Sequence, residues 1–333
     1  MKVLRAGVLG FCMGVRRAVT MAGAELDARS AAGNPPVFSL GPLIHNPQTL
    51  ASLKKRGLAV LDEAGGLCPP DPAGRQIPDS GEKPVVIIRA HGVSPRVEEN
   101  LRANGFRVVD ATCPRVKTSQ NTAMDLAKRG LVVFIAGEKN HAEVKGIAGY
   151  VYSGAEARAD TPDKASPAVC VIAGTVAEAE QAAADLRRER PDAETALIAQ
   201  TTFSEEEYGR IAAAIKKSFP NLELKDTICG ATRRRQDALK KLCAEVDAVI
   251  VAGGRDSANT RRLLAIAGQC GKPCWLAETA ADLPPELGRC RIAGLCAGAS
   301  TPDDVIEEIA AALENDVIEK IAAALENAGG ALS

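Results

Sequence analysis

Short apolar runs alternate along the chain with longer stretches in which apolar residues recur every three or four positions. The short runs predict β-strands, since most of them end in small or polar residues. They cover residues 3–10, 35–41, 84–90, 106–112, 131–137, 168–174, 195–200, 247–254 and 290–296. The longer stretches predict helices within residues 121–130, 175–190, 204–219 and 233–246. This alternation is typical of α/β proteins with parallel sheets, in which ligands bind beyond the carboxyl ends of the strands.

The length of 333 residues exceeds what one hydrophobic core usually serves. We expect three pseudo-equivalent α/β units with mainly parallel sheets over residues 1–112, 113–228 and 229–303, the first including the N-terminal strand that leads to Cys12. Residues 62–84 are rich in Gly, Pro and Asp and predict a surface loop. The tail, 304–333, contains the near-duplicates DVIEEIAAALEN and DVIEKIAAALEN, which predict a lengthened terminal helix or a partner-binding one.

Charge and composition exclude some classes of protein. The formal net charge of −1 and an aromatic content of 3% argue against a nucleic-acid binder. No apolar run reaches the eighteen residues or so that a membrane-spanning helix needs. The opening MKVLRAGVLGFCMGVRRAV lacks a small-residue cleavage site, and Arg16 and Arg17 interrupt its apolar character. We therefore expect a strand followed by a helix there, and a cytoplasmic protein.

Three cysteines share one kind of setting: Cys12, Cys113 and Cys229 each follow a strand-like run and precede a predicted helix. Helix N-termini favour thiolates, and three thiolates suit an iron–sulfur cluster with one iron that has no protein ligand. A closed zinc site would want a fourth ligand and short local spacings, which the sequence lacks. The residues alone leave two interpretations of these three cysteines open: a convergent metal site, or three buried structural cysteines.

The three histidines also follow predicted strands. His45, His91 and His141 lie in IHNPQTL, AHGVSP and NHAEVKG, and imidazoles in such positions can bind phosphate. Glu143, two residues after His141, is a candidate proton donor. The alternative for each histidine is a structural or solvated side chain.

Hydroxyl and amide side chains follow other strands. They are Gln200, Thr201, Thr202 and Ser204 in AQTTFS, Ser257 and Asn259 after Gly253 and Gly254, and Ser300 and Thr301 before the last helix. Turns of this composition that lead into helix N-termini are anion sites, although Ser and Thr are also ordinary helix caps.

Eight motifs together resemble the 4-hydroxy-3-methylbut-2-enyl diphosphate reductase family, from about residue 3 to about residue 305 and in the family's order. They are GFCMGVRRAV, IHNPQTL, AHGVSP, DATCPRV, NHAEVKG, QTTFS, DTICGATRRRQ and GGRDSANTRRL. The resemblance implies α/β units around a central 4Fe–4S cluster with an open apical iron, held by residues matching Cys12, Cys113 and Cys229. It also implies an iron–sulfur oxidoreductase of the non-mevalonate (MEP) pathway of isoprenoid biosynthesis.

The implied reaction is the two-electron reductive dehydroxylation of the allylic diphosphate to isopentenyl and dimethylallyl diphosphate. By resemblance His45, His91, Ser257, Asn259 and Ser300 hold the diphosphate, His141 is a further pocket residue with a catalytic part, and Glu143 and Thr201 deliver the proton. The implied partner is a one-electron donor of the ferredoxin or flavodoxin type. A rival hypothesis is a non-catalytic iron–sulfur redox sensor that binds an anionic ligand, which would have no need of a proton relay.

Some features depart from the family pattern. Ala258 stands where many relatives have a second serine, and Cys296 replaces a residue that is often threonine. We assign the remaining seven cysteines to packing or to the surface: Cys68, Cys170, Cys243, Cys270, Cys274, Cys290 and Cys296. Cys270 and Cys274 form a CxxxC pattern, which we interpret as the end of a helix and the start of a strand.

Overall fold

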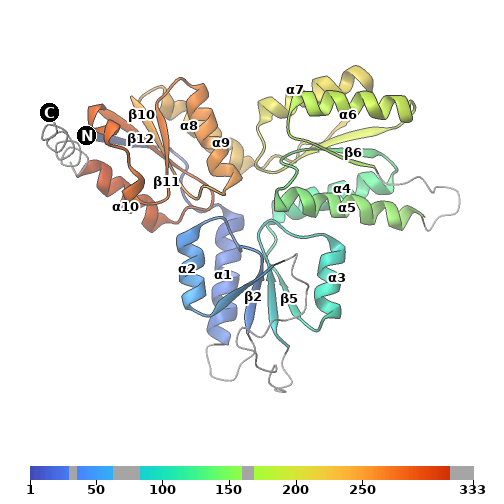
Figure 1. Cartoon of the computed structure of the whole chain (residues 1–333), viewed down its shortest axis with the longest axis horizontal. Coiled ribbons are helices and arrows are strands. Elements are labelled where there is room, and N and C mark those ends of the chain that lie inside the picture. Colours follow the sequence, from blue (N-terminus) through green and yellow to red (C-terminus); the bar gives the residue numbers. More distant parts are fainter. Residues whose placement is uncertain (30–35, 63–82, 160–168, 316–333) are drawn as a thin grey trace, which may run out of the picture. The chain divides into compact units, whose positions relative to one another are not determined.

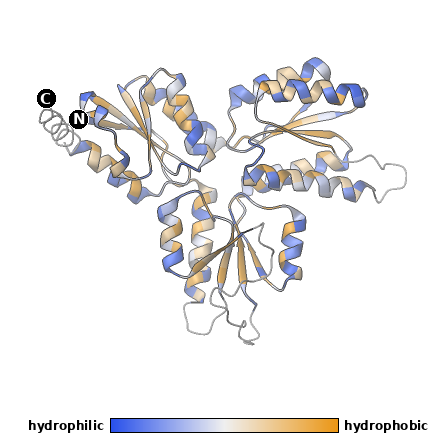
Figure 2. Cartoon of the chain, viewed as in Figure 1, coloured by the Kyte–Doolittle hydropathy of each residue, from blue (hydrophilic) through white to orange (hydrophobic). Residues whose placement is uncertain are grey.

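A computed structural model describes residues 1–29, 36–62, 83–159 and 169–315. In these ranges twelve strands form three four-stranded sheets, and every pair of neighbouring strands is parallel (Figure 1). The hydrophobic residues concentrate on the strands and on the helix faces that cover them (Figure 2). The expected α/β class with three parallel sheets is confirmed.

Contacts divide the chain into two compact units. The terminal unit consists of Met1–Cys12, His45–Thr49 and the described residues after Cys229; the central unit consists of Met13–Ile44 and Leu50–Cys229. The terminal unit contains one sheet, and the central unit contains two.

The terminal unit's sheet joins the start of the chain to its later part. Its strands, in spatial order, are β1 (Lys2–Arg5), β12 (Ile292–Ala297), β10 (Ala248–Ala252) and β11 (Cys274–Ala277). The helical segments of this unit are α8 (Gly230–Cys243), α9 (Ala258–Gln269), η1 (Ala280–Asp282), η2 (Pro285–Arg289) and α10 (Asp303–Glu314). Alternate residues of β10 face opposite cores, Ile250 packing in the cluster with α10, and Val249 in the cluster with α8 and α9.

The first sheet of the central unit has the order β3 (Leu58–Leu61), β2 (Val37–Leu40), β4 (Val85–Ile88), β5 (Arg107–Asp110). The neighbouring helices in sequence are α1 (Met13–Ala28), α2 (Pro47–Lys55) and α3 (Pro95–Ala103). The α3 helix begins at Pro95, because the Ser94 hydroxyl accepts a hydrogen bond from the Val97 backbone N–H at 3.3 Å and Pro95 occupies the first turn.

The second sheet of the central unit has the order β7 (Cys170–Ala173), β6 (Val132–Ala136), β8 (Thr195–Ala199), β9 (Glu223–Leu224). Its helices are α4 (Pro114–Lys128), α5 (Ala142–Ala159), α6 (Val176–Glu189) and α7 (Glu205–Ser218). Phe134 packs in the cluster formed with α6 and α7, whereas Val133 packs in the cluster formed with α4 and α5. Both faces of this sheet are therefore covered, as its continuous apolar strands require.

Each of the nine predicted strand regions overlaps a strand, and each of the four predicted helix regions lies in a helix apart from two or three end residues. The strands β3, β9 and β11 were not predicted from the pattern. The expected first unit, 1–112, includes the N-terminal strand, and that strand pairs with β12 in the terminal unit's sheet. The unit boundaries at 112, 228 and 303 stay predictions.

Other expectations fall partly outside the described residues. The first of the duplicated tail segments forms most of α10, while the second, residues 316–327, and nearly all of the predicted loop 62–84, with Cys68, lie outside them. None of the helices in the described ranges combines the length and apolar character needed to cross a bilayer.

Candidate functional site

Cys113 lies in the turn between β5 and α4. Its backbone N–H donates to the Ala90 carbonyl at 2.9 Å, and the helix starts at once with Pro114 in its first turn. Pro114 suits this position because its ring presets a helical φ and the first turn needs no N–H donor there. The DATCP segment therefore holds a half-buried thiol at the N-terminus of a helix.

Helix α1 packs directly against this cysteine through Gly14. A Cβ atom added at Gly14 would lie 2.5 Å from the Cys113 Sγ and 2.9 Å from its Cβ. Distances below 3.0 Å do not occur for real Cβ contacts, so only glycine permits this approach.

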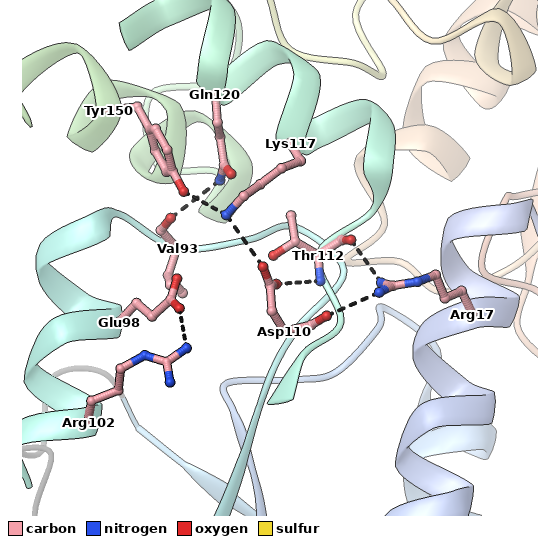
Figure 3. Close-up of polar contacts among 9 residues, drawn as sticks. All are labelled: Arg17, Val93, Glu98, Arg102, Asp110, Thr112, Lys117, Gln120 and Tyr150. Carbon is pink, nitrogen blue, oxygen red and sulfur yellow. Dashed lines mark hydrogen bonds and ion pairs between the residues drawn. The ribbon is translucent and has the colours of Figure 1, made fainter. Parts of the chain in front are cut away.

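A polar network fixes the residues that precede Cys113 (Figure 3). The Arg17 guanidinium donates to the carbonyls of Thr112 at 3.0 Å and Asp110 at 3.3 Å. The Asp110 carboxylate accepts from the Thr112 N–H at 2.9 Å and from the Lys117 ammonium at 3.4 Å. Burial acts to raise the pKa of Asp110, but the hydrogen bonds from Thr112 and the charge of Lys117 outweigh it and hold that pKa below its usual value.

Two of the predicted histidines meet in the central unit. The rings of His91 and His141 lie edge to face with centroids 5.2 Å apart. The Nδ1 atom of His141 accepts from the Glu143 backbone N–H at 3.2 Å, so a neutral imidazole carries its proton on Nε2. Gly92, with φ of +70°, lets the turn after His91 pass close to the Gln120 amide.

Glu143 and Thr201 form a buried pair. The carboxylate accepts from the Thr201 N–H at 2.6 Å and from its hydroxyl at 2.9 Å, and the side chains are 1% and 5% exposed. Burial raises the pKa of Glu143 to about 7, although the backbone and side-chain hydrogen bonds from Thr201 lower it. A carboxyl with this pKa exchanges protons near neutral pH, as a general acid must.

The third cysteine of the predicted set adjoins this pair. The Cys229 backbone N–H donates to the Thr201 carbonyl at 2.9 Å, and α8 begins at the next residue. The central unit thus brings the Glu143–Thr201 pair beside Cys229.

The terminal unit contains the remaining predicted residues. Ser257 caps α9 by accepting from the Thr260 N–H at 3.3 Å, and the Ser300 hydroxyl donates to the His45 carbonyl at 3.0 Å. Asn259, in the first turn of α9, is 5% exposed, and its buried Nδ2 donor has no hydrogen-bond partner among the residues that the structure describes. The Cys12 N–H donates to the Ala299 carbonyl at 3.0 Å.

Glycines make this part of the terminal unit compact. A Cβ at Gly254 would lie 2.7 Å from the His45 carbonyl oxygen, and one at Gly298 would lie 2.2 Å from the Thr260 hydroxyl. Backbone and polar side chains therefore approach closely around the N-terminus of α9, where the buried amide donor of Asn259 and the helix dipole favour an anion.

The predicted residues fall into two groups, one in each unit. The central unit contains Cys113, Cys229, His91, His141, Glu143 and Thr201, and the terminal unit contains Cys12, His45, Ser257, Asn259 and Ser300. Sequence reasoning did not single out Asp110, Arg17 or Lys117 as a network. The charged residues of this network are visible in DATCPRVK and VRRAV. Their contacts could not be predicted, because helix α1 and the strand before Cys113 are far apart in sequence.

The other described cysteines pack in the fold or lie at its surface. Cys243 and Cys296 are buried, Cys170, Cys274 and Cys290 are half-buried, and Cys270 is exposed. Cys270 is the C-cap of α9 and Cys274 is the first residue of β11, as the CxxxC interpretation predicts.

These features define a class of protein: a parallel α/β protein in which cysteines, histidines and a carboxylic acid with a raised pKa lie where strands end and helices begin. Residues 3–314 match the family model of the LytB protein. A protein of Treponema pallidum named 4-hydroxy-3-methylbut-2-enyl diphosphate reductase is 45% identical over 322 residues, which cover 93% of this chain and 83% of that protein.

Two solved structures are similar over nearly the whole chain. The E-1-hydroxy-2-methyl-but-2-enyl-4-diphosphate reductase from Plasmodium falciparum is 25% identical with a TM-score of 0.77, and the match covers 95% of this chain and 89% of that one. An (E)-4-hydroxy-3-methyl-but-2-enyl diphosphate reductase, described as the terminal enzyme of the non-mevalonate pathway, is 34% identical with a TM-score of 0.62, covering 94% and 99%. The chain belongs to the LytB family of 4-hydroxy-3-methylbut-2-enyl diphosphate reductases.

Proposed function

We propose that this chain catalyses the reaction for which its relatives are named, the reduction of 4-hydroxy-3-methylbut-2-enyl diphosphate to isopentenyl and dimethylallyl diphosphate. One observation carries the proposal within the structure. A buried carboxylic acid with a pKa of about 7 is hydrogen-bonded to a threonine hydroxyl, and the carbonyl of that threonine is bonded to the N–H of Cys229. A redox sensor would have no use for this proton relay, so the pair favours the reductase over the sensor.

The cofactor in this proposal is a 4Fe–4S cluster with Cys12, Cys113 and Cys229 as its three protein ligands. The chemistry of the donors fits, because each cysteine is half-buried and stands within one residue of the start of a helix, where a thiolate is favoured. Gly14 adds support, since any side chain there would press on the Cys113 sulfur. When bound, the cluster supplies electrons one at a time and an iron without a protein ligand that polarises the C–O bond to be broken.

The diphosphate of the substrate is bound in this proposal by His45, His91, Ser257, Asn259 and Ser300. The buried Nδ2 donor of Asn259 supports the assignment, since a buried N–H without an acceptor costs about 1–3 kcal/mol and a phosphate oxygen would remove that cost. The side chain of Ala258 offers no donor at the N-terminus of this helix, so the proposal assigns the N-cap Ser257 and the first-turn Asn259 to the phosphate.

Glu143 and Thr201 deliver the proton for loss of the hydroxyl group. In its neutral form Glu143 donates to the Thr201 oxygen, whose own hydrogen then turns towards the hydroxyl of the substrate, and the oxygen leaves as water. His141 is the second polar residue of this pocket in the proposal, with Nε2–H as its donor because Nδ1 accepts from the Glu143 N–H. The two electrons come singly from an external donor of the ferredoxin or flavodoxin type, and a second proton, added to the allylic species that remains, completes either product.

The test is to purify the full chain anaerobically, count iron and sulfide per chain, and measure turnover of the allylic diphosphate with a strong one-electron reductant. We expect iron-linked absorbance, and formation of both five-carbon diphosphates. A chain that binds no iron after anaerobic reconstitution would overturn the proposal. A chain that binds iron but leaves the substrate unchanged would support the sensor instead.

A further inference from the structure

The loop that carries Cys113 is held by more contacts than a simple strand-to-helix turn needs. Gly14 and Arg17 stand three residues apart on α1 and therefore project from the same side of the helix. Gly14 faces the Cys113 sulfur. Arg17 donates to the main-chain carbonyls of Asp110 and Thr112, which precede Cys113. One helix thus fixes both the thiol and the backbone leading to it.

The charges in this network are arranged around one carboxylate. Asp110 accepts from its own loop through the Thr112 N–H, and from α4 through Lys117, whose ammonium also donates to the Tyr150 hydroxyl at 2.8 Å (Figure 3). Arg17 adds a second cation on the main-chain side of the loop. The three charged side chains of this network, Arg17, Asp110 and Lys117, thus carry two positive charges and one negative charge.

We propose that Arg17 and Asp110 are positioning residues that aim the Cys113 thiolate and, through their opposite charges, set the reduction potential of the cluster it binds. This inference rests on the proposed function, because Cys113 must be a cluster ligand. Each electron added makes the cluster more negative, so a nearby cation favours the reduced state and a nearby anion opposes it. A purely structural role predicts no such difference in sign.

The experiment measures midpoint potentials by EPR-monitored redox titration of the anaerobically reconstituted full chain. Arg17→Gln should lower the potential and Asp110→Asn should raise it, each changing the reduction equilibrium about tenfold, which is ~59 mV for one electron. Arg17→Lys should keep a potential close to that of the unmodified chain, because the charge remains. It should also lose iron several-fold faster to a chelator, because lysine lacks the fork that binds two carbonyls.

The matched control is Arg102→Gln, which removes one cation from the exposed Glu98–Arg102 pair on α3, with N···O of 2.6 Å (Figure 3). It should leave the potential unchanged. If Arg17→Gln does not retain iron, the variant Lys117→Met is measured in its place. Lys117→Met also removes a cation next to Asp110 and should also lower the potential. Shifts of the same sign for Asp110→Asn and the cation variant, or no shift in either, would overturn the inference.

Iron content and turnover of the unmodified chain separate the two proposals. If the unmodified chain holds no iron, the proposed function fails. If it holds iron and reduces the substrate while the variants lack the opposite shifts, only the role of Arg17 and Asp110 fails.

Discussion

Replacing Glu143 by glutamine tests the proposed acid with the least change in shape. Glutamine keeps the volume of the side chain and an oxygen that can accept from the Thr201 N–H, but it has no proton to transfer. General acid catalysis contributes about 10²–10⁴-fold to a rate, and Glu143→Gln should lower kcat by that range. Iron content should stay the same, because Glu143 is not one of the proposed ligands.

The magnitude of the pKa shift predicts how the rate depends on pH. Burial raises the pKa of Glu143 from 4.5 to about 7, against the hydrogen bonds from Thr201. At pH 7 roughly half of the chains then carry the proton, whereas at the ordinary value only about one in 300 would. Turnover by the unmodified chain should therefore fall as the pH rises through about 7, whereas turnover by the Glu143→Gln chain should not show this fall.

The same shift predicts a change in stability. Since the pKa is about 7 in the folded chain and 4.5 as the ordinary value, the native state binds more protons than the unfolded state between these two pH values. This stabilising contribution is complete below pH 4.5 and is lost as the pH rises through about 7. The free energy of unfolding should fall by about 3 kcal/mol across that window, and Glu143→Gln should remove this part of the dependence.

The assay is steady-state turnover under anaerobic conditions at pH values on both sides of 7, with iron per chain measured for each preparation. Glu156→Gln is the matched control, because Glu156 lies on the same helix, α5, and is exposed. The control should match the unmodified chain in rate and pH profile. A Glu143→Gln chain with an unchanged rate, and with the same fall in rate as the pH rises through about 7, would falsify the acid role.

Three other substitutions give sharp expectations. Gly14→Ala should reduce iron per chain severalfold in iron assays, because its Cβ would lie 2.5 Å from the Cys113 sulfur. Gly7→Ala, with open space around the new Cβ, should retain iron. Equal iron in both variants would contradict a role of the Gly14–Cys113 contact in holding the cluster. Asn259→Ala should raise KM about 10- to 100-fold in turnover assays, since it removes a buried donor worth about 1.5–3 kcal/mol to a charged group; an unchanged KM would exclude the phosphate contact. Thr201→Val should lower kcat with intact iron while Thr201→Ser restores it, and a valine variant with full activity would remove the hydroxyl from the relay.

Much of the fold could be predicted because its strands are buried on both faces. Continuous apolar runs such as 131–137 and 247–254 need cover on both sides, and the intervening helices provide it. The strands that escaped prediction are short or mixed in composition: β9 has two residues, and β3 leaves Val60 exposed. The pairing of β1 with β12 could not be predicted either, because nothing in either segment specifies a partner 290 residues away.

The candidate site was predictable as a set of residues but not as a geometry. Glu143 and Thr201 are 58 residues apart, and only the parallel alignment of β6 and β8 brings the segments after these strands together to form the 2.9 Å contact. The perturbed pKa of Glu143 could not be predicted either, since it depends on burial by side chains from distant segments.

The position of Glu143 argues for function more strongly than its identity does. A glutamine there could occupy the same volume and accept from the Thr201 N–H without any cost of burying a charge, so a purely structural site would be more stable with glutamine at pH 8. We therefore expect opposite effects from one substitution: Glu143→Gln gains up to about 3 kcal/mol of stability at pH 8, as measured by denaturant unfolding of the metal-free chain, and loses turnover. A variant that lost stability and activity together would mean that the carboxylate serves the fold, and the acid would have to be sought elsewhere.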